Sequence, residues 1–466
     1  MLTAVPGDTL LMSTSITWTN QVIILSGNGS ADNPITLRSD STSGAPVILN
    51  GSSRLSISGT YLVVDGLRFE GGAVTQEKQH VIEFRTSSSD LASDCRLTNT
   101  AVIDYNPSPV GSVIDTRWVG LYGTYNRVDH CYFYGKDHKG ALLIVWRRSD
   151  DTPDYHTIDS NYFGDFASGL GENGWETMRI GTSSNSLSDS STTIKDNLFE
   201  ECNGEIEIIS IKSGNSLIQG NTFRSNEGSL TLRHGRGNTV DGNFFIGKTT
   251  PIIDRSSGGI RVIDSDHVVI NNYFEGMGSN SDAAIVLANG LEKSALSEYF
   301  PTERALIAFN TMYNCKEAFR IGWRSSANTV KVTDSTIANN AVFSASGVSS
   351  VIINEEAAPI NMLYEGNYMY GAGVVLGLSP VPTGISEVDP DLVLGVGGLH
   401  RPSTTSPCID DAVGSYLTVV VDMDGQSRPS GQAKDVGADE VSTDTATSGP
   451  SSSSDIGGNI GPSWWA

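Results

Sequence analysis

The segments Asn221-Thr222-Phe223, Asn243-Phe244-Phe245 and Asn272-Tyr273-Phe274 carry the pattern that decides the fold. Each places an asparagine two residues before an aromatic residue, and the same pattern, with Met at the third position in two cases, recurs along the chain. Its asparagines are Asn161, Asn197, Asn221, Asn243, Asn272, Asn310 and Asn367. The first six are separated by 36, 24, 22, 29 and 38 residues. Spacings of 22 and 24 residues, lengthened elsewhere by insertions, are typical of a parallel β-helix whose coils carry loops.

Stacked coils would place the repeated side chains directly above one another. The asparagines could then hydrogen-bond to each other and to the turn backbone, while the phenylalanines stack inside. An antiparallel sandwich would instead show hairpin turns at regular intervals of about 8 to 12 residues, which this chain lacks. We therefore predict an all-β fold, a parallel β-helix that forms a single solenoid domain.

The length of 466 residues exceeds that of a usual single domain, but a repeat fold escapes this limit because each coil packs only on its neighbours. We expect residues 1–440 to form the β-helix, with an N-terminal cap within residues 1–30. Residues 441–466 contain 7 Ser, 3 Thr and 4 Gly and are expected to be a flexible tail.

The net charge of −23 is unfavourable for a general nucleic-acid or anionic-membrane binder, so neither is an expected partner. No run of about 18 apolar residues is present that would span a membrane. The five cysteines are far apart and indicate neither a disulfide framework nor a zinc site. Residues 1–3 lack the features of a signal peptide and residues 4–10 already resemble a first strand, so we expect a secreted or periplasmic protein whose export signal has been removed.

The segment from Asn203 to Ser213, which reads NGEIEIISIKS, holds two carboxylates and a lysine within a short β-pattern. Alternation predicts that Ile206 and Ile208 point into the core while Glu205 and Glu207 point outward. Two adjacent outward acids repel each other unless a cation lies between them. The simplest alternative is a solvated strand face. It is less favoured because the segment LTLRHG at residues 230–235 brings an arginine to the next coil.

Lys212 stands nine residues before Asn221 and Arg233 ten before Asn243, so we expect their side chains on adjacent coils, about 4.8 Å apart along the stack. Strict alternation would turn Lys212 inward relative to the glutamates, and a bend near Ser210 must restore it to the outside. Asn173, one coil earlier, offers an amide oxygen near the same place. Asn173, Glu205 and Glu207 would form an oxygen shell suited to Ca²⁺.

These segments, together with Asn173–Thr177, Gly258–Arg261 and Asn271–Tyr273, resemble polysaccharide lyase family 6, which contains alginate lyases and chondroitinase B. The resemblance covers most of the chain up to about residue 440. It implies a right-handed parallel β-helix, with Asn173, Glu205 and Glu207 as Ca²⁺ ligands. It also implies that Lys212 is the Brønsted base and Arg233 the Brønsted acid. Trp175 departs from the pattern, which has a small residue at this position.

The implied reaction is β-elimination on a uronate polymer, with alginate as the expected substrate. The C5 proton of a uronate is barely acidic, because its removal adds charge beside a carboxylate. A bound Ca²⁺ can neutralise that carboxylate. Lys212 must be neutral to accept the proton, and neighbouring positive charge favours the neutral form. A guanidinium hardly deprotonates, so a water polarised by Arg233, or His234, could deliver the proton to the departing O4.

Further basic residues are expected along the groove as contacts to neighbouring uronate carboxylates. They are His234, Arg261, Arg179, Lys136 and Lys139. The alternative for Arg179 and Arg261 is a purely structural role in tying turns together.

Three other functions stay open from the sequence. The first is a dermatan sulfate lyase similar to chondroitinase B. The second is a β-helix glycoside hydrolase, for which Asp150-Asp151 and Asp410-Asp411 are the paired aspartates. The third is a non-catalytic carbohydrate-binding adhesin, which would not require Lys212 and Arg233 beside an acidic pair.

Overall fold

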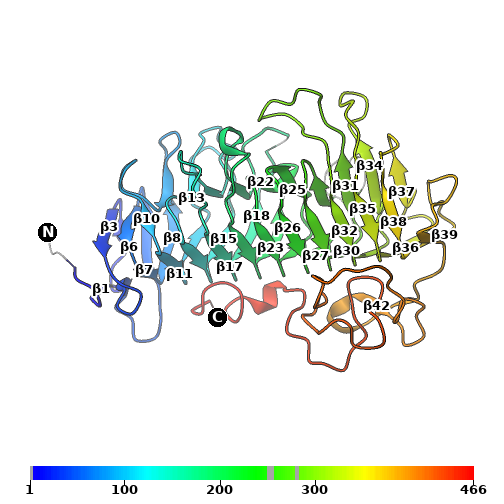
Figure 1. Ribbon diagram of the computed structural model, residues 1–466. Coiled ribbons are helices and arrows are strands. Elements are labelled where there is room, and N and C mark those ends of the chain that lie inside the picture. The colour runs from blue at the N-terminus through cyan, green and yellow to red at the C-terminus, as the bar shows by residue number, and fades with distance from the viewer. Residues whose placement is uncertain (1–3, 170, 249–256, 279–282, 466) are drawn as a thin grey trace. The chain divides into compact units, whose positions relative to one another are not determined.

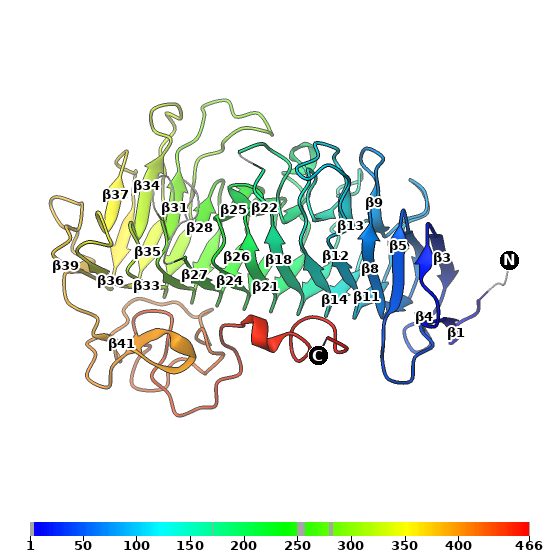
Figure 2. The same cartoon turned by 180° about the vertical axis from the view of Figure 1, so that it is seen from behind.

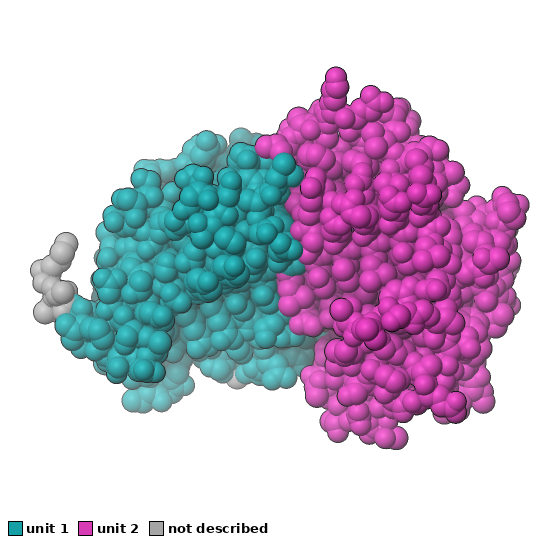
Figure 3. All heavy atoms as spheres, viewed as in Figure 1, with its two compact units in different colours: residues 1–216, 451–466 teal, residues 217–450 magenta. Residues whose placement is uncertain are grey.

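The structure, a computed structural model, describes residues 4–169, 171–248, 257–278 and 283–465. Residues 1–3, whose lack of signal-peptide features was considered above, lie outside the described residues. The chain divides into two compact units (Figure 3). Unit 1 comprises residues 1–216 and 451–466, and unit 2 comprises residues 217–450.

Successive coils contribute strands to three parallel sheets, here called A, B and C in the order in which the chain visits them (Figure 1). In unit 1, sheet A contains β1 (Thr9–Met12), β4 (Ile35–Ser39), β7 (Leu62–Asp65), β11 (Arg96–Thr98), β14 (Arg127–Asp129), β17 (Thr157–Asp159) and β20 (Thr193–Lys195). Sheet B contains β2 (Trp18–Thr19), β5 (Val47–Gly51), β8 (Leu67–Gly72), β12 (Ala101–Ile103), β15 (Tyr132–Tyr134), β18 (Tyr162–Phe166) and β21 (Leu198–Cys202). Sheet C contains β3 (Val22–Asn28), β6 (Arg54–Thr60), β9 (His80–Glu83), β10 (Ala92–Ser93), β13 (Arg117–Leu121), β16 (Leu143–Val145), β19 (Met178–Ile180) and β22 (Glu207–Lys212).

Unit 2 repeats this arrangement (Figure 2). Its sheet A contains β23 (Leu217–Gln219), β26 (Thr239–Asp241), β29 (Val268–Ile270), β32 (Leu306–Ala308), β35 (Thr336–Ala338) and β38 (Leu363–Glu365). Its sheet B contains β24 (Thr222–Arg224), β27 (Phe244–Ile246), β30 (Tyr273–Glu275), β33 (Thr311–Tyr313), β36 (Ala341–Ala345), β39 (Asn367–Ala372) and β40 (Ile385–Ser386). Its sheet C contains β25 (Gly228–His234), β28 (Ser257–Val262), β31 (Ile285–Ala288), β34 (Phe319–Trp323) and β37 (Ile353–Glu355).

The remaining elements are small. Strands β41 (Leu392–Leu394) and β42 (His400–Pro402) form an antiparallel pair, and η1 (Ser183–Asn185), η2 (Val396–Gly398) and η3 (Ser453–Asp455) are single 3₁₀ turns. Within the described ranges no α-helix occurs, and thus none long and apolar enough to cross a membrane.

The predicted all-β, parallel β-helix fold is confirmed. Strands β1, β2 and β3 pair in register with β4, β5 and β6, so residues 9–28 form the first coil.

The repeated asparagines form the predicted ladder at the turn between sheets A and B. In unit 2 the Asn243 Nδ2 donates to Asn272 Oδ1 at 2.9 Å, and Asn272 Nδ2 donates to Asn310 Oδ1 at 3.0 Å. Asn340 continues the ladder to Asn367, although the residue that follows its pattern is Val342 and not an aromatic residue. All of these side chains are buried. The ladder therefore satisfies backbone and side-chain groups that water cannot reach.

The aromatic residues of the pattern stack inside each unit. Phe133, Phe163 and Phe199 have centroid separations of 5.2 and 4.9 Å in unit 1. In unit 2 the rings of Phe223, Phe245 and Phe274 follow one another at 4.6 and 4.8 Å. These separations match the strand spacing of a parallel sheet, because every ring occupies the same position in its coil.

The C-terminal residues, expected from their composition to be a flexible tail, have defined contacts at their end. Within unit 1 the Trp465 ring stacks on Tyr132 with a centroid separation of 4.0 Å, and Trp464 Nε1 donates to Asn99 O at 2.7 Å. Gly461 N donates to Ser160 O at 2.9 Å. The two tryptophans thus cover part of sheet B of unit 1, next to β15.

The first prediction concerns the ladder. Asn272 Nδ2 donates to Val240 O, Ile270 O and Asn310 Oδ1, and Asn272 Oδ1 accepts from Asn243 N and Nδ2, so Asn272→Ala removes five buried hydrogen bonds. We expect the change to destabilise the protein by about 2 kcal/mol or more. Thermal unfolding followed by calorimetry measures this. Asn28→Ala is the matched control, because Asn28 is exposed and, among the described residues, its Oδ1 accepts a side-chain hydrogen bond only from Thr60 Oγ1. An equal effect of both substitutions would contradict the role of the ladder.

The second prediction concerns the terminal tryptophan. Trp465→Ala removes the stack on Tyr132 and the contact with Arg68, whose Cζ lies 5.7 Å from the indole centroid. The ring is half-buried, so we expect a loss of about 1–2 kcal/mol, less than for a fully buried aromatic residue. The melting temperature should fall by a few degrees, whereas Val110→Ala, at an exposed apolar residue of the same unit, should leave it unchanged. An unchanged melting temperature of the Trp465 variant would show that the segment contributes nothing to stability.

Candidate functional site

Lys212 ends the last strand of sheet C in unit 1. Strand β22 pairs with β19 so that Met178, Arg179 and Ile180 lie opposite Ile209, Ser210 and Ile211. Ile209 and Ile211 are fully buried, which assigns Ser210 and Lys212 to the outer face by strand alternation. The Lys212 side chain is 20% exposed. The prediction that the lysine returns to the outside is consistent with this register.

The predicted alternation around the two glutamates is wrong at Ile206. Strand β22 begins only at Glu207, and Ile206 is 46% exposed while Glu205 is buried at 6%. Gly204 is responsible for part of this arrangement, because a Cβ at that position would lie 2.0 Å from Trp175 O. The backbone therefore passes close to the preceding coil at Gly204, and residues 204–206 lie outside β22.

The bend that brings Glu207 and Lys212 onto one face lies between Glu207 and Ser210. Ile208 and Ile209 are both buried, which a regular strand does not allow at adjacent positions when one face is outside. Ser210 Oγ donates to Glu207 Oε2 at 2.5 Å, so the two side chains lie on the same side. The expected bend near Ser210 therefore occurs at Ile208 and Ile209, directly before that residue.

Glu176 is the acid that lies beside Lys212, and sequence reasoning did not assign it a role. Its Oε1 is 3.9 Å from Lys212 Nζ and 3.5 Å from Arg179 Nη1. The side chain is buried, and among the described residues its Oε2 has no hydrogen-bond partner. The signal was its place in the segment Asn173–Thr177, but only the folded chain brings its carboxylate next to the Lys212 side chain.

The other predicted residues of unit 1 differ in their surroundings. Asn173 is exposed on the loop before β19, and the Lys139 side chain runs beside Gly174, 3.5 Å from the position of a Cβ there. Arg179 lies on the outer face with a side chain that is 17% exposed. Trp175, which departed from the family pattern, is buried against Phe166.

Lys136 is not a groove contact, and that prediction is corrected. Its side chain is fully buried, its Nζ donates to His138 O at 2.5 Å, and the same nitrogen lies 4.8 Å from the Phe166 centroid. Burial lowers the pKa of Lys136 well below its ordinary value. The local excess of basic residues in the sequence did not distinguish this inward-facing lysine from exposed ones.

Arg233 is the penultimate residue of β25 in unit 2, and a loop holds its side chain. Its Nη1 donates to Glu298 O at 2.6 Å and its Nη2 to Ser297 O at 3.2 Å. The guanidinium carbon lies 4.2 Å from the Tyr299 centroid. These contacts orient the guanidinium. The sequence did not identify Tyr299 or its loop, because these contacts join residues that are far apart in the chain.

His234 and Arg261 are buried in unit 2. Their exposed fractions are 1% and 3%, and Arg261 Nε donates to Ser229 Oγ at 2.7 Å. Strand pairing places Arg261 opposite Thr231, one coil after β25. Their predicted contact with substrate stays a prediction.

The predicted base and acid are divided between the units, with Lys212 in unit 1 and Arg233 in unit 2.

The two aspartate pairs considered for a hydrolase occupy turns. Asp150 accepts two hydrogen bonds from Arg148, at 3.1 and 2.6 Å, and one from Thr152 N. In the Asp410-Asp411 pair, Asp410 Oδ1 accepts from Ala433 N at 2.9 Å. Asp150 stabilises a local turn and Asp410 a contact with Ala433, so the structure gives no support to a catalytic carboxylate pair at either position.

Comparison with known proteins agrees with this architecture. The family model described as Chondroitinase B matches residues 1–374. A search of curated protein sequences gives no match. Solved structures that match include the PL6 family alginate lyase AlyGC, at 33% identity over 86% of this chain and 53% of that chain, with a TM-score of 0.79. A variant of AlyGC matches at 30% identity over 99% of this chain and 57% of that chain, with a TM-score of 0.81.

A mannuronic acid specific polysaccharide family 6 lyase from human gut microbiota is also similar. It is 30% identical over 83% of this chain and 86% of that chain, with a TM-score of 0.72. This chain thus spans most of the gut lyase, but only about half the length of AlyGC. The extent of the family match and the identity to the gut lyase show that the chain belongs to polysaccharide lyase family 6, the family of alginate lyases and chondroitinase B.

Proposed function

We propose that this protein is an alginate lyase that cleaves its polymer by β-elimination and leaves an unsaturated uronate at the new end. The observation that carries the proposal is Lys212 beside Glu176 and Arg179 on the outer face of sheet C. Most other residues of this strand are buried, so a chemical role explains the lysine at its end better than a packing role does. Several relatives of 28 to 33% identity are named as family 6 lyases, and some of these as alginate lyases.

The reaction divides between two proposed groups. Neutral Lys212 accepts the C5 proton, the electrons of the C5–H bond form the C4–C5 double bond, and the C4–O4 bond breaks. The departing O4 takes a proton from a water polarised by Arg233 or from His234. The carbonyls of Ser297 and Glu298 hold two Arg233 nitrogens, which supports an orienting role for this guanidinium. Arg179, one coil before Lys212, is available to pair with a substrate carboxylate.

Asn173, Glu205 and Glu207 would hold Ca²⁺ in this proposal. The donors are one amide oxygen and two carboxylates, and such hard oxygen ligands are what Ca²⁺ prefers. Glu176 adds a buried oxygen without a hydrogen-bond partner among the described residues, on the same segment as Asn173. Bound Ca²⁺ would supply neutralisation of the uronate carboxylate next to the proton that Lys212 removes.

Dermatan sulfate is the second candidate substrate, because the matching family model is described as Chondroitinase B. Both polymers contain uronates, so the same elimination applies. A panel of polymannuronate, polyguluronate, mixed alginate and dermatan sulfate distinguishes the two substrates, with turnover followed by the ultraviolet absorbance of the new double bond.

An enzyme acting on such polymers would work outside the cytoplasm, so we propose a secreted or periplasmic location.

The third prediction tests the base and the acid. Lys212→Ala and Arg233→Ala should each lower kcat on alginate by at least about 10²-fold, because each removes a proton-transfer or charge-stabilising group. Lys212→Ala should keep the wild-type melting temperature, whereas Arg233→Ala, which also loses its hydrogen bonds to Ser297 O and Glu298 O, should stay folded with a slightly lower one. Lys195→Ala and Arg304→Ala, at exposed ion-paired residues of the same types, are the matched controls and should keep full activity. Substantial turnover by either site variant would refute the assignment.

The fourth prediction tests the metal. Exhaustive chelation should suppress activity and lower the melting temperature, and added Ca²⁺ should restore both. Glu205→Gln and Glu207→Gln should weaken Ca²⁺ binding measured by equilibrium dialysis, whereas Glu70→Gln, on sheet B, should not. If activity and Ca²⁺ content survive both substitutions, the two glutamates are structural and the metal has no part in the mechanism.

A further inference from the structure

A row of residues runs from Lys212 along sheet C of unit 1. The strand residues paired in series are Leu121, Val145, Ile180 and Ile211. The residues that directly follow them are Tyr122, Trp146, Gly181 and Lys212. Since each coil advances by about 4.8 Å, Trp146 lies roughly 10 Å from Lys212 along the stack and Tyr122 roughly 14 Å. The row therefore connects the proposed base with two aromatic rings.

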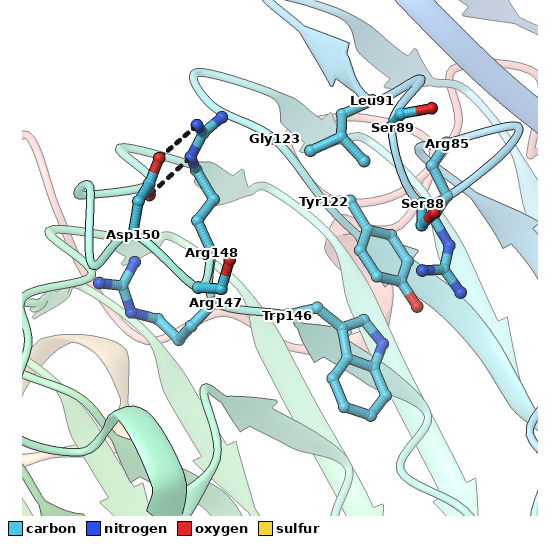
Figure 4. A pocket seen from close by; sticks show the side chains of 11 residues that line it. Arg85, Ser88, Ser89, Leu91, Tyr122, Gly123, Trp146, Arg147, Arg148 and Asp150 are labelled. Atoms are coloured by element: carbon cyan, nitrogen blue, oxygen red, sulfur yellow. Dashed lines mark hydrogen bonds and ion pairs between the residues drawn. The ribbon is translucent and has the colours of Figure 1, made fainter.

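These rings line a cavity of about 490 Å³ within unit 1, which we call the aromatic pocket (Figure 4). Its lining includes Arg85, Leu91, Tyr122, Trp146, Arg148 and Asp150. Figure 4 shows Tyr122 and Trp146 side by side, with Arg85 on one side of them and Arg148 with Asp150 on the other. Flat aromatic faces with a few convergent charged groups are typical of a small-molecule or sugar site.

The orientation of the two rings is determined by their neighbours. Their centroids are 6.1 Å apart with an interplanar angle of 13°. Trp146 Nε1 donates to His80 Nε2 at 3.3 Å, and the Arg117 guanidinium carbon lies 5.2 Å from the Trp146 centroid. Burial lowers the pKa of His80 to about 3, so this histidine is neutral and able to accept that hydrogen bond. The platform is thus held in place before any ligand binds.

Cationic groups at the pocket remain accessible. Arg85 is about a third exposed, its Cζ lies 3.9 Å from the Tyr122 centroid, and its Nε is 3.3 Å from Glu83. Arg148 pairs with Asp150 at an exposed position. Arg147, in contrast, is committed to the buried Asp154 at 2.6 Å. Arg85 and Arg148 are therefore the candidates for pairing with an anionic ligand, in a chain whose net charge is −23.

Gly181 keeps the row open between Trp146 and Lys212. A Cβ at Gly181 would lie 2.8 Å from Lys212 O and 3.1 Å from Arg147 Cγ, and its φ of +80° favours glycine. Neighbouring atoms thus pack closely against this position, and glycine contributes no side chain between the base and the platform. A polymer that reacts at Lys212 can continue over this position toward Trp146.

We propose that the aromatic pocket is a distal subsite that binds one further uronate residue of the polymer whose cleaved bond lies at Lys212. The apolar face of that sugar would lie on the Trp146 and Tyr122 rings, and its carboxylate would pair with Arg85. This inference rests on the proposed function. A neutral sugar would gain the stacking contact but not the ion pair, so the pocket selects for acidic chains.

The test uses the full-length protein and alginate oligosaccharides of increasing length, from trimers to octamers. For the wild type, kcat/KM should rise at the length at which the chain first reaches the pocket. Trp146→Ala should lose about tenfold in kcat/KM on the long oligosaccharides and nothing on the short ones. Arg85→Gln should lose about threefold on the long ones only, and this loss should shrink at high salt. Arg38→Gln, an exposed arginine on β4, is the matched control.

A loss that is equal at all lengths would overturn the subsite, as would a wild type without length dependence. Because Trp146 contacts His80 and Arg117, Trp146→Phe and Arg85→Gln keep the test informative if Trp146→Ala unfolds. Calorimetric binding of the same oligosaccharides to the inactive Lys212→Ala variant, with and without Trp146→Phe and Arg85→Gln, tests the pocket independently of turnover. Failure of the proposed function would appear differently, as no double-bond product from any alginate with the wild type.

Discussion

The structure depends on one constraint, the in-register stacking of coils by backbone hydrogen bonds. A coil has no hydrogen-bonding partner of its own, because each strand pairs only with the corresponding strands of the coils before and after it. A shift of a single residue would turn every inward side chain outward. The asparagine ladder resists such a shift, since each buried amide bonds both to its neighbour in the ladder and to the turn backbone, as Asn243 does to Asn272 and Ile218.

The ladder also relies on an unusual backbone conformation just before it. The residue that precedes each ladder asparagine adopts a left-handed conformation, with φ values of 56° at Ser160, 54° at Asp196 and 54° at Phe309. This conformation turns the chain sharply from sheet A into sheet B within two residues. The turn is identical in successive coils, whereas the loops that follow sheets B and C vary in length. Functional residues can therefore change on these loops without disturbing the register.

In-register stacking also generates the site. Residues that are about 20 to 40 apart in the sequence become neighbours on the outer face of sheet C, which is how Arg179 comes to lie beside Ser210. The same face holds groups that compete for one acceptor, because the buried Glu176 Oε1 lies 3.5 Å from Arg179 Nη1 and 3.9 Å from Lys212 Nζ. In unit 2 the arrangement differs, since a loop holds Arg233 through main-chain carbonyls.

The sequence by itself determined the fold class, because the spacing of Asn-x-aromatic segments reports the coil directly. It also identified Lys212, Arg233 and the glutamates as candidate groups, since acids and bases at strand ends depart from the pattern that packing requires. The sequence could not determine which side chains face outward where the strand is irregular. Ile206 and Glu205 exchange their expected places because Gly204 passes against Trp175. Lys136 turns inward toward His138 O, and Glu176 reaches Lys212 from another coil. These outcomes depend on contacts between residues distant in sequence, which only the tertiary structure decides.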